Sequence, residues 1–245
     1  MGHVTDWRPR LVRWMTVASA VAVLASLVTY AMARAAAATS QGEFWAEVHE
    51  NLFVGIERNL PTWLATVMWA GFALAAWAQW LVASEKRMPW MILSLVGWGA
   101  SIDEALMLHD RLSAPSDRIE TIAGIDLGGA TWVLLGGVVA ASVGLTLLRF
   151  VLGLPGETRR DLLVGAALFL LGAVGFEVLS SLFFESTGEF GWAVVTLIHI
   201  EEGLEFAGVV IATRGLLRLT PSPEVTGPAQ LRTNGGDGPS QWPSR

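Results

Sequence analysis

Six carboxylates and one histidine occur in stretches of the sequence that are apolar enough to lie in a lipid bilayer. They are Asp103, Glu104, Glu177, His199, Glu201, Glu202 and Glu205. No Lys or Arg accompanies them within these stretches. An ionised group at the centre of a membrane helix costs about 2.5 to 3.5 kcal/mol even on the lenient insertion scale. These acids must therefore be protonated, hydrated in a cavity, or bound to a cation.

Their positions along three predicted helices put these groups in one layer. Because a helix rises about 1.5 Å per residue, Asp103, Glu177 and His199 lie roughly 10 to 13 Å below the outer end of their helices. The four polar residues of the last helix share one arc, with Leu197 and Ile200 on the opposite side. We therefore expect a polar cavity among these helices, open to the outer side. Its expected lining is Asp103, Glu177, His199 and Glu202.

Carboxylates with imidazoles and no sulfur ligand favour a divalent metal ion. Iron, manganese or zinc fits better than copper(I), and an all-oxygen subset would suit magnesium or calcium. The chain has no Cys, which excludes thiolate ligands, thiol nucleophiles and disulfides. The expected metal ligands are Asp103, Glu104, His109, Glu177, His199, Glu202 and Glu205. His109 lies near the outer surface, where capping a helix end is an equal alternative to a ligand role.

Three classes of function fit this pattern. The first is a metal-centred site that acts on a lipid-like or periplasmic substrate or simply holds a cation. If it is an enzyme, a metal would activate water and Glu201 or Glu104 would be the general base. The second is a proton- or metal-ion-coupled transporter, in which the carboxylates of the last helix pass the ion. The third is a structural membrane subunit whose acids are protonated and hydrogen-bonded between helices.

The elements that position these residues are apolar segments of spanning length. Of the 245 residues, 53% are apolar and 16% are charged, whereas soluble domains carry about 25% charged residues. Segments of about 20 apolar residues can cross a bilayer. They fall at 11–33, 61–83, 89–108, 127–148, 162–184 and 191–213. The sequence thus predicts an all-α, polytopic bundle of six transmembrane helices over residues 11–219, with membrane lipid as its surroundings and no nucleic-acid partner.

The basic residues predict that both ends of the chain are cytoplasmic. The loops 84–88 and 149–161 and the two ends of the chain hold 12 of the 16 Lys and Arg residues, and such residues are retained inside. Those at the two ends are Arg8, Arg10, Arg13, Arg214, Arg218, Arg232 and Arg245. Residues 34–60, 110–126 and 185–190 are then expected to face outward from a bacterial inner membrane. The tail 1–10 is short, and the tail 220–245 is rich in Pro, Gly, Ser and Thr, which predicts disorder.

Two further patterns bear on packing and access. In the outer segment 42–59, Phe44, Val48, Leu52 and Ile56 recur at helical spacing, which predicts an amphipathic helix on the membrane surface. This helix would either cover helix ends as a lid or gate the cavity. Small residues at Gly136, Ala140 and Gly144, and the pair Gly203 and Gly208, predict close helix contacts.

The strings SIDEALMLH at 101–109 and EEGLEFAG at 201–208 resemble functionally uncharacterised bacterial multi-span membrane proteins with S-x-D-E-x4-H and E-E-x-x-E strings. This resemblance implies a multi-pass membrane protein and no particular activity. The stretch 202–205 is also similar to the Arg-Glu-Gly-Leu-Glu signature of iron permeases. Glu201 stands where their Arg stands and a second copy is absent, so this likeness implies carboxylate spacing only.

Overall fold

The regular structure of the chain is helical throughout the part that is described. The computed structural model describes residues 6–109, 111, 121–122, 124 and 130–220. Its elements are α1 (Arg8–Ala36), α2 (Gly42–Leu52), α3 (Leu60–Val82), α4 (Arg87–Leu106), α6 (Trp132–Leu152), α7 (Gly156–Leu170), the π-helix η2 (Leu171–Phe176), α8 (Glu177–Thr187) and α9 (Trp192–Leu217). The predicted all-α class is confirmed. Most of the predicted outer loop 110–126 and nearly all of the predicted tail 220–245 lie outside the described residues.

Several helices have the length and composition of membrane spans. Among the described residues, four stretches qualify: Arg8–Ala36, Leu60–Val82, Trp132–Leu152 and the continuous stretch Gly156–Thr187. They match the predicted first, second, fourth and fifth spans and indicate a multi-pass membrane protein. The predicted third and sixth spans correspond to α4 and α9, which are helical but carry five of the acids discussed above.

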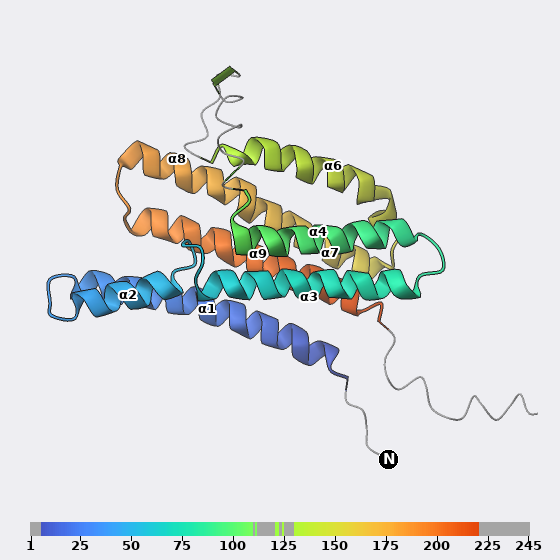
Figure 1. The fold of residues 1–245 in the computed structure, drawn as a ribbon, viewed down its shortest axis with the longest axis horizontal. Helices are drawn as coiled ribbons and strands as arrows, with labels where there is room; N and C mark the ends of the chain where they lie inside the picture. Colours follow the sequence, from blue (N-terminus) through green and yellow to red (C-terminus); the bar gives the residue numbers. More distant parts are fainter. Residues whose placement is uncertain (1–5, 110, 112–120, 123, 125–129, 221–245) are drawn as a thin grey trace, which may run out of the picture.

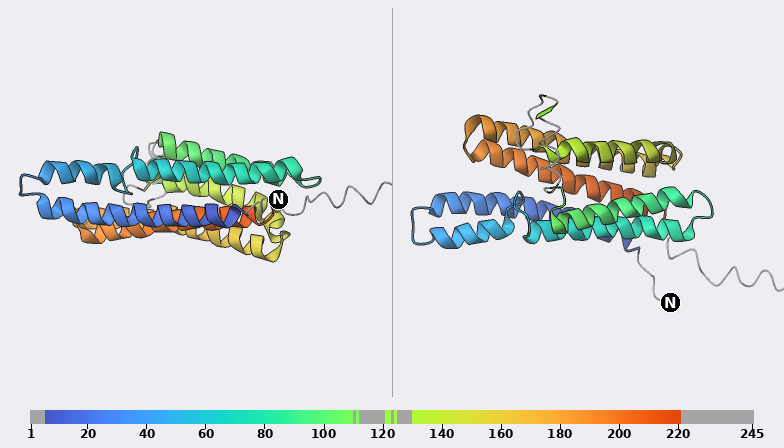
Figure 2. Two further views of the ribbon diagram at one scale, coloured as in Figure 1. Left: turned by 90° about the horizontal axis from the view of Figure 1, so that it is seen from below. Right: turned by 45° about the horizontal axis from the view of Figure 1, so that its top comes forward.

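The helices run along one long axis and form an elongated bundle (Figure 1). Helices α3 and α4 form a hairpin, and α9 runs back along α7, η2 and α8. The turns at 83–86 and 153–155 lie at the end of the bundle where α1 begins and α9 ends (Figures 1 and 2). The turns at 37–41 and 188–191 lie at the opposite end. The predicted basic loops 84–88 and 149–161 therefore lie at one end of the bundle.

Helix α7 approaches α9 so closely that only glycine fits at the contact. A Cβ atom built on Gly208 would lie 2.7 Å from the carbonyl oxygen of Gly165 and 2.8 Å from the amide nitrogen of Phe169. A Cβ atom on Gly165 would meet the Gly208 carbonyl oxygen at the same distance of 2.7 Å. Gly203, on the same helix as Gly208, would meet nothing within 4 Å. Gly203 and Gly208 were both predicted to allow close helix contacts, but only Gly208 lies at the contact with α7.

The small residues of α6 do not make the helix contact that the sequence predicts. A Cβ atom on Gly136 would touch the ring of Trp132 on the same helix, and one on Gly144 would meet no atom of the described structure within 4 Å. Val139 and Leu145 are 61% and 74% exposed. Within the described residues, α6 therefore packs loosely and turns its small residues away from the bundle.

An ion-pair cluster around one buried carboxylate joins α7 and α9 at the end of the bundle where α9 ends. The Asp161 side chain is 1% exposed and accepts hydrogen bonds of 2.9 and 2.8 Å from the Arg214 guanidinium. The Nε atom of Arg218 donates to the same carboxylate over 3.0 Å. Loss of the Asp161 side chain would take this partner from both arginines, whereas loss of one arginine would leave the carboxylate paired with the other. Arg214 and Arg218 thus join α9 to α7 through Asp161. The sequence had indicated only that such basic residues favour a cytoplasmic C-terminal end.

Candidate functional site

The long helix from α7 to α8 changes its winding beside the candidate site. The π-helix η2 ends at Phe176, immediately before Glu177. Within it, a Cβ atom on Gly172 would lie 2.7 Å from the Glu201 carbonyl oxygen and 2.8 Å from Cγ of Glu205. Glycine therefore lets η2 lie directly against the acidic stretch of α9. Such π-segments inside α-helices occur frequently at functional sites, whereas the sequence predicted one regular span over 162–184.

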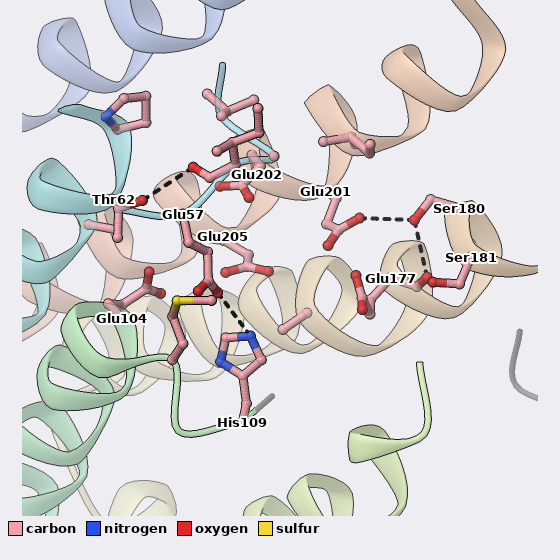
Figure 3. A pocket seen from close by; sticks show the side chains of 18 of the residues that line it. Glu57, Thr62, Glu104, His109, Glu177, Ser180, Ser181, Glu201, Glu202 and Glu205 are labelled. Carbon is pink, nitrogen blue, oxygen red and sulfur yellow. Dashed lines mark hydrogen bonds and ion pairs between the residues drawn. The ribbon is translucent and has the colours of Figure 1, made fainter. Parts of the chain in front are cut away.

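A cavity of about 690 Å³ opens between η2, α8, α9, the end of α4 and the segment 53–59 that joins α2 to α3. Figure 3 shows carboxylates pointing into it from several of these elements. The acids of its wall are Glu57, Asp103, Glu104, Glu177, Glu201, Glu202 and Glu205. Among the lining residues that the structure describes, only Arg58 carries a fixed positive charge. When these acids are ionised, the cavity is strongly negative.

Three of these carboxylates have no polar partner among the described residues. Glu104 on α4 and Glu202 and Glu205 on α9 make no hydrogen bond or ion pair there, and Figure 3 shows them around one part of the cavity. A spacing of three residues puts Glu202 and Glu205 on one face of α9. A second space of about 10 Å³ beside the three acids is lined by Trp69 and Phe206, among other apolar side chains. The acids thus stand between the cavity and an apolar core.

His109 links two acids at the cavity wall. Its Nε2 atom lies 3.1 Å from Oε1 of Glu57, and its Nδ1 atom lies 3.1 Å from Oδ2 of Asp103. The backbone amide of His109 also donates to Oδ1 of Asp103 over 2.7 Å. This contact follows the end of α4, where Met107 adopts a left-handed conformation with φ of 54°. Because a protonated imidazole donates from both nitrogens, this arrangement suits a charged His109 between two carboxylates.

The opposite wall of the cavity holds two acids that are already hydrogen-bonded. Glu177 accepts a hydrogen bond of 3.3 Å from the indole nitrogen of Trp132. Glu201 accepts one of 3.3 Å from the hydroxyl of Ser180. These two carboxylates face one another across this part of the cavity in Figure 3. Because these hydrogen bonds occupy oxygen lone pairs of Glu177 and Glu201, fewer lone pairs remain for a cation than on Glu202 and Glu205.

His199 is not part of the cavity wall, contrary to the expected lining. Its Nδ1 atom lies 2.6 Å from the Val195 carbonyl oxygen and its Nε2 atom 2.8 Å from Oγ of Ser26 on α1. The polar arc of α9 is wide enough to face two neighbours, and α1 covers the edge that carries His199. A helical wheel shows which residues share an arc but not which neighbour covers each edge.

Glu57 lies in the cavity wall, although no pattern in the sequence indicated it. One amphipathic helix was expected over 42–59, whereas α2 ends at Leu52 and an extended Phe53 follows. Asn59 caps α3 by accepting a hydrogen bond from the Thr62 amide, and Pro61 stands in the first turn of α3. An Asn followed by a Pro in the first turn is a typical helix start. This signal could have identified the preceding residues as a link between helices.

The described side chains do not form a ready-made metal site. In the part of the chain covered by the structure, no three His, Asp or Glu side chains stand together as a coordination sphere. Glu104, Glu202 and Glu205 have long side chains whose carboxylates can turn toward a shared ion. A cavity of this size also has room for an ion that keeps several of its waters, as Mg²⁺ usually does.

The fold and the cavity define an all-α protein that combines an acidic chamber with helices long and apolar enough to cross a membrane. The chain matches the family described as Domain of unknown function (DUF8692) over residues 12–219, and it belongs to this family. The matched residues include α2 to α9 and therefore every described element of the cavity wall. The comparison with curated proteins and the comparison with solved structures found no match.

Proposed function

We propose that this protein is a bacterial inner-membrane protein that binds a divalent metal ion in the acidic cavity. The observation that carries the proposal is the group of Glu104, Glu202 and Glu205, which face one cavity without a polar partner among the described residues. Neighbouring carboxylates with apolar side chains beside them repel one another when ionised, and a divalent cation offsets this repulsion. Iron, manganese or zinc suits carboxylates with a nearby imidazole.

In this proposal the acids have different tasks. Glu104, Glu202 and Glu205 bind the ion, directly or through its waters. The pair formed by His109 and Glu57 lies in the same cavity wall and adjusts the charge that the ion meets. Glu201, beside Ser180, would serve as the base if the bound ion activates water for a reaction.

A direct test measures metal binding by the purified chain. We expect Mn²⁺ or Zn²⁺ to raise the melting temperature, because an ion that binds only the folded state stabilises it. Binding is expected to weaken as the pH falls, since protons compete with the ion for the carboxylates. The measurements are thermal unfolding in detergent and titration with MnCl2 at several pH values. The proposal is wrong if the protein is purified without metal and its melting temperature does not change when iron, manganese or zinc is added.

We propose further that α4 and α9 also cross the bilayer, which gives six spans with both ends in the cytoplasm and the cavity on the outer side. The loops 84–88 and 149–161, the start of α1 and the end of α9 lie at one end of the bundle and carry ten of the sixteen Lys and Arg residues, which supports this orientation (Figure 1). The outer ends of α3 and α4 and the start of α6 then lie at the level of the cavity.

Single cysteines in this cysteine-free chain test the orientation. With Glu189→Cys we expect labelling by a membrane-impermeant maleimide in intact cells, because residues 185–190 face outward in the proposed topology. With Lys86→Cys we expect labelling only after the membrane is opened. The parent chain is the control and should stay unlabelled. Labelling of Lys86→Cys alone in intact cells would reverse the orientation.

Coupled transport of protons or metal ions is the second candidate. The small space beyond Glu104, Glu202 and Glu205 supports it, because it extends from these acids toward the core of the bundle. Apolar side chains, among them Met68, Trp69 and Val209, close this space, and transport would require them to separate. Uptake of Mn²⁺ by vesicles that contain the protein distinguishes a transporter from a protein that only holds the ion.

A further inference from the structure

A buried chain of hydrogen bonds joins α9, α1 and the segment 53–59. The carbonyl oxygen of Val195 can only accept, so the Nδ1 atom of His199, 2.6 Å away, carries a hydrogen. In the neutral ring Nε2 then accepts, and the hydroxyl of Ser26, 2.8 Å away, donates to it. The direction of this hydrogen bond therefore follows from the fixed carbonyl.

The same serine holds the start of the segment that carries Glu57. The backbone amide of Val54 donates to Oγ of Ser26 over 3.1 Å. Ser26 is fully buried, and Val54 is 5% exposed. Because the hydroxyl gives its own hydrogen to His199, its oxygen is directed toward the Val54 amide. His199 thus orients Ser26, and Ser26 anchors Val54.

Aromatic packing and a helix cap complete the attachment. The Phe53 ring is 2% exposed and lies 5.5 Å from the ring of His199, measured between centroids. The side-chain amide of Asn59 donates to the Phe53 carbonyl oxygen over 2.7 Å. Between these two anchors the segment passes over the cavity and brings Glu57 to His109. The segment 53–59 is therefore held by hydrogen bonds and ring packing at its two ends, and its middle faces the cavity.

We propose that Ser26 and His199 are positioning residues that hold the segment 53–59 closed over the cavity. Their hydrogen bond sets how often the segment opens and how readily a solute reaches the acids. The proposal rests on the proposed function only in taking the cavity as a binding site. The position of the segment can be measured without any metal.

A cysteine reporter on the segment tests this role. Ile56 lines the cavity and is 38% exposed, so Ile56→Cys reports opening through its rate of reaction with a water-soluble maleimide. Adding His199→Leu should raise this rate about fivefold, the effect of losing one buried hydrogen bond. Ser26→Ala should raise it at least as much, because it also removes the acceptor of the Val54 amide. His199→Gln should stay near the parent rate, because its amide oxygen can accept from Ser26. The full chain in detergent is used throughout.

Two controls separate local opening from general loosening. Ser19→Ala removes another buried hydroxyl of α1, which bonds to the Met15 carbonyl oxygen, and should leave the Ile56→Cys rate unchanged. A second reporter, Ser94→Cys, lies fully buried between α3 and α4 and should react equally slowly in every background. The double variant Ser26→Ala with His199→Leu should match Ser26→Ala, because that substitution already removes both the hydrogen bond to His199 and the one from the Val54 amide.

The outcomes decide between this role and a purely structural one. Unchanged reactivity at Ile56→Cys in both backgrounds overturns the proposal, and so does an equal rise at Ser94→Cys. If one of the two variants, Ser26→Ala or His199→Leu, cannot be produced as folded protein, the other still tests the proposal. A parallel titration with MnCl2 separates the two proposals. Absence of Mn²⁺ binding with increased reactivity rejects the metal site alone, whereas binding with unchanged reactivity rejects the closure alone.

Discussion

Replacing Gly208 with alanine is expected to destabilise the protein severely, while replacing Gly203 with alanine is expected to be tolerated. The new Cβ atom at Gly208 would lie 2.7 Å from a backbone oxygen of α7 and 2.8 Å from a backbone nitrogen. Rotation of a side chain cannot relieve contacts with backbone, so α7 and α9 would have to separate. Overpacking of a core typically costs about 1 to 3 kcal/mol, and this contact has little room to adjust.

Gly203→Ala is a matched control because it makes the same chemical change on the same helix. Its Cβ atom would meet nothing within 4 Å, and alanine favours a helix over glycine by about 1 kcal/mol. We therefore expect this variant to melt at or above the temperature of the parent. The measurement is thermal unfolding in detergent, together with the yield of monodisperse protein. A Gly208→Ala protein that melts with the parent would contradict the contact between α7 and α9.

Glu202→Gln is expected to weaken metal binding strongly. The change keeps the size of the side chain but removes a charge that has no polar partner among the described residues. A tenfold or greater loss of Mn²⁺ affinity corresponds to about 1.4 kcal/mol or more. Glu201→Gln should have a smaller effect, because Glu201 already accepts a hydrogen bond from Ser180.

Glu189→Gln, in the exposed turn between α8 and α9, is the control for a lost negative charge and should bind Mn²⁺ as the parent does. The affinity of each variant is measured by calorimetric titration or by the spectrum of bound Mn²⁺. If the acids are merely protonated and structural, Glu202→Gln would behave like Glu189→Gln, since a neutral amide can still hydrogen-bond. Equal affinities in the two variants would remove Glu202 from the site.

The general architecture could be predicted because lipid imposes simple requirements on a sequence. Apolar runs of spanning length predicted the helices, and the depths of Asp103, Glu177 and Glu202 along their helices predicted a shared polar cavity, which these three residues line. The partner of His199 could not be predicted, since the hydrophobic pattern of α9 does not tell α1 from α4 as its neighbour. The π-helix was also beyond prediction, because its six residues, LGAVGF, are apolar or small on every side.

The π-helix has a consequence for how the packing and the chemistry of this protein can vary. In a continuous α-helix each residue advances by about 100°, so the orientation of Gly165 would dictate that of Glu177. The wider π-turn between them contains one more residue than an α-helical turn. It therefore changes the direction in which Glu177 points relative to Gly165. Helix α7 can therefore keep Gly165 turned toward α9, while α8, which carries Glu177, is rotated differently about the same helix axis. A change confined to residues 171–176 could redirect Glu177 without disturbing the glycine contact that joins α7 to α9.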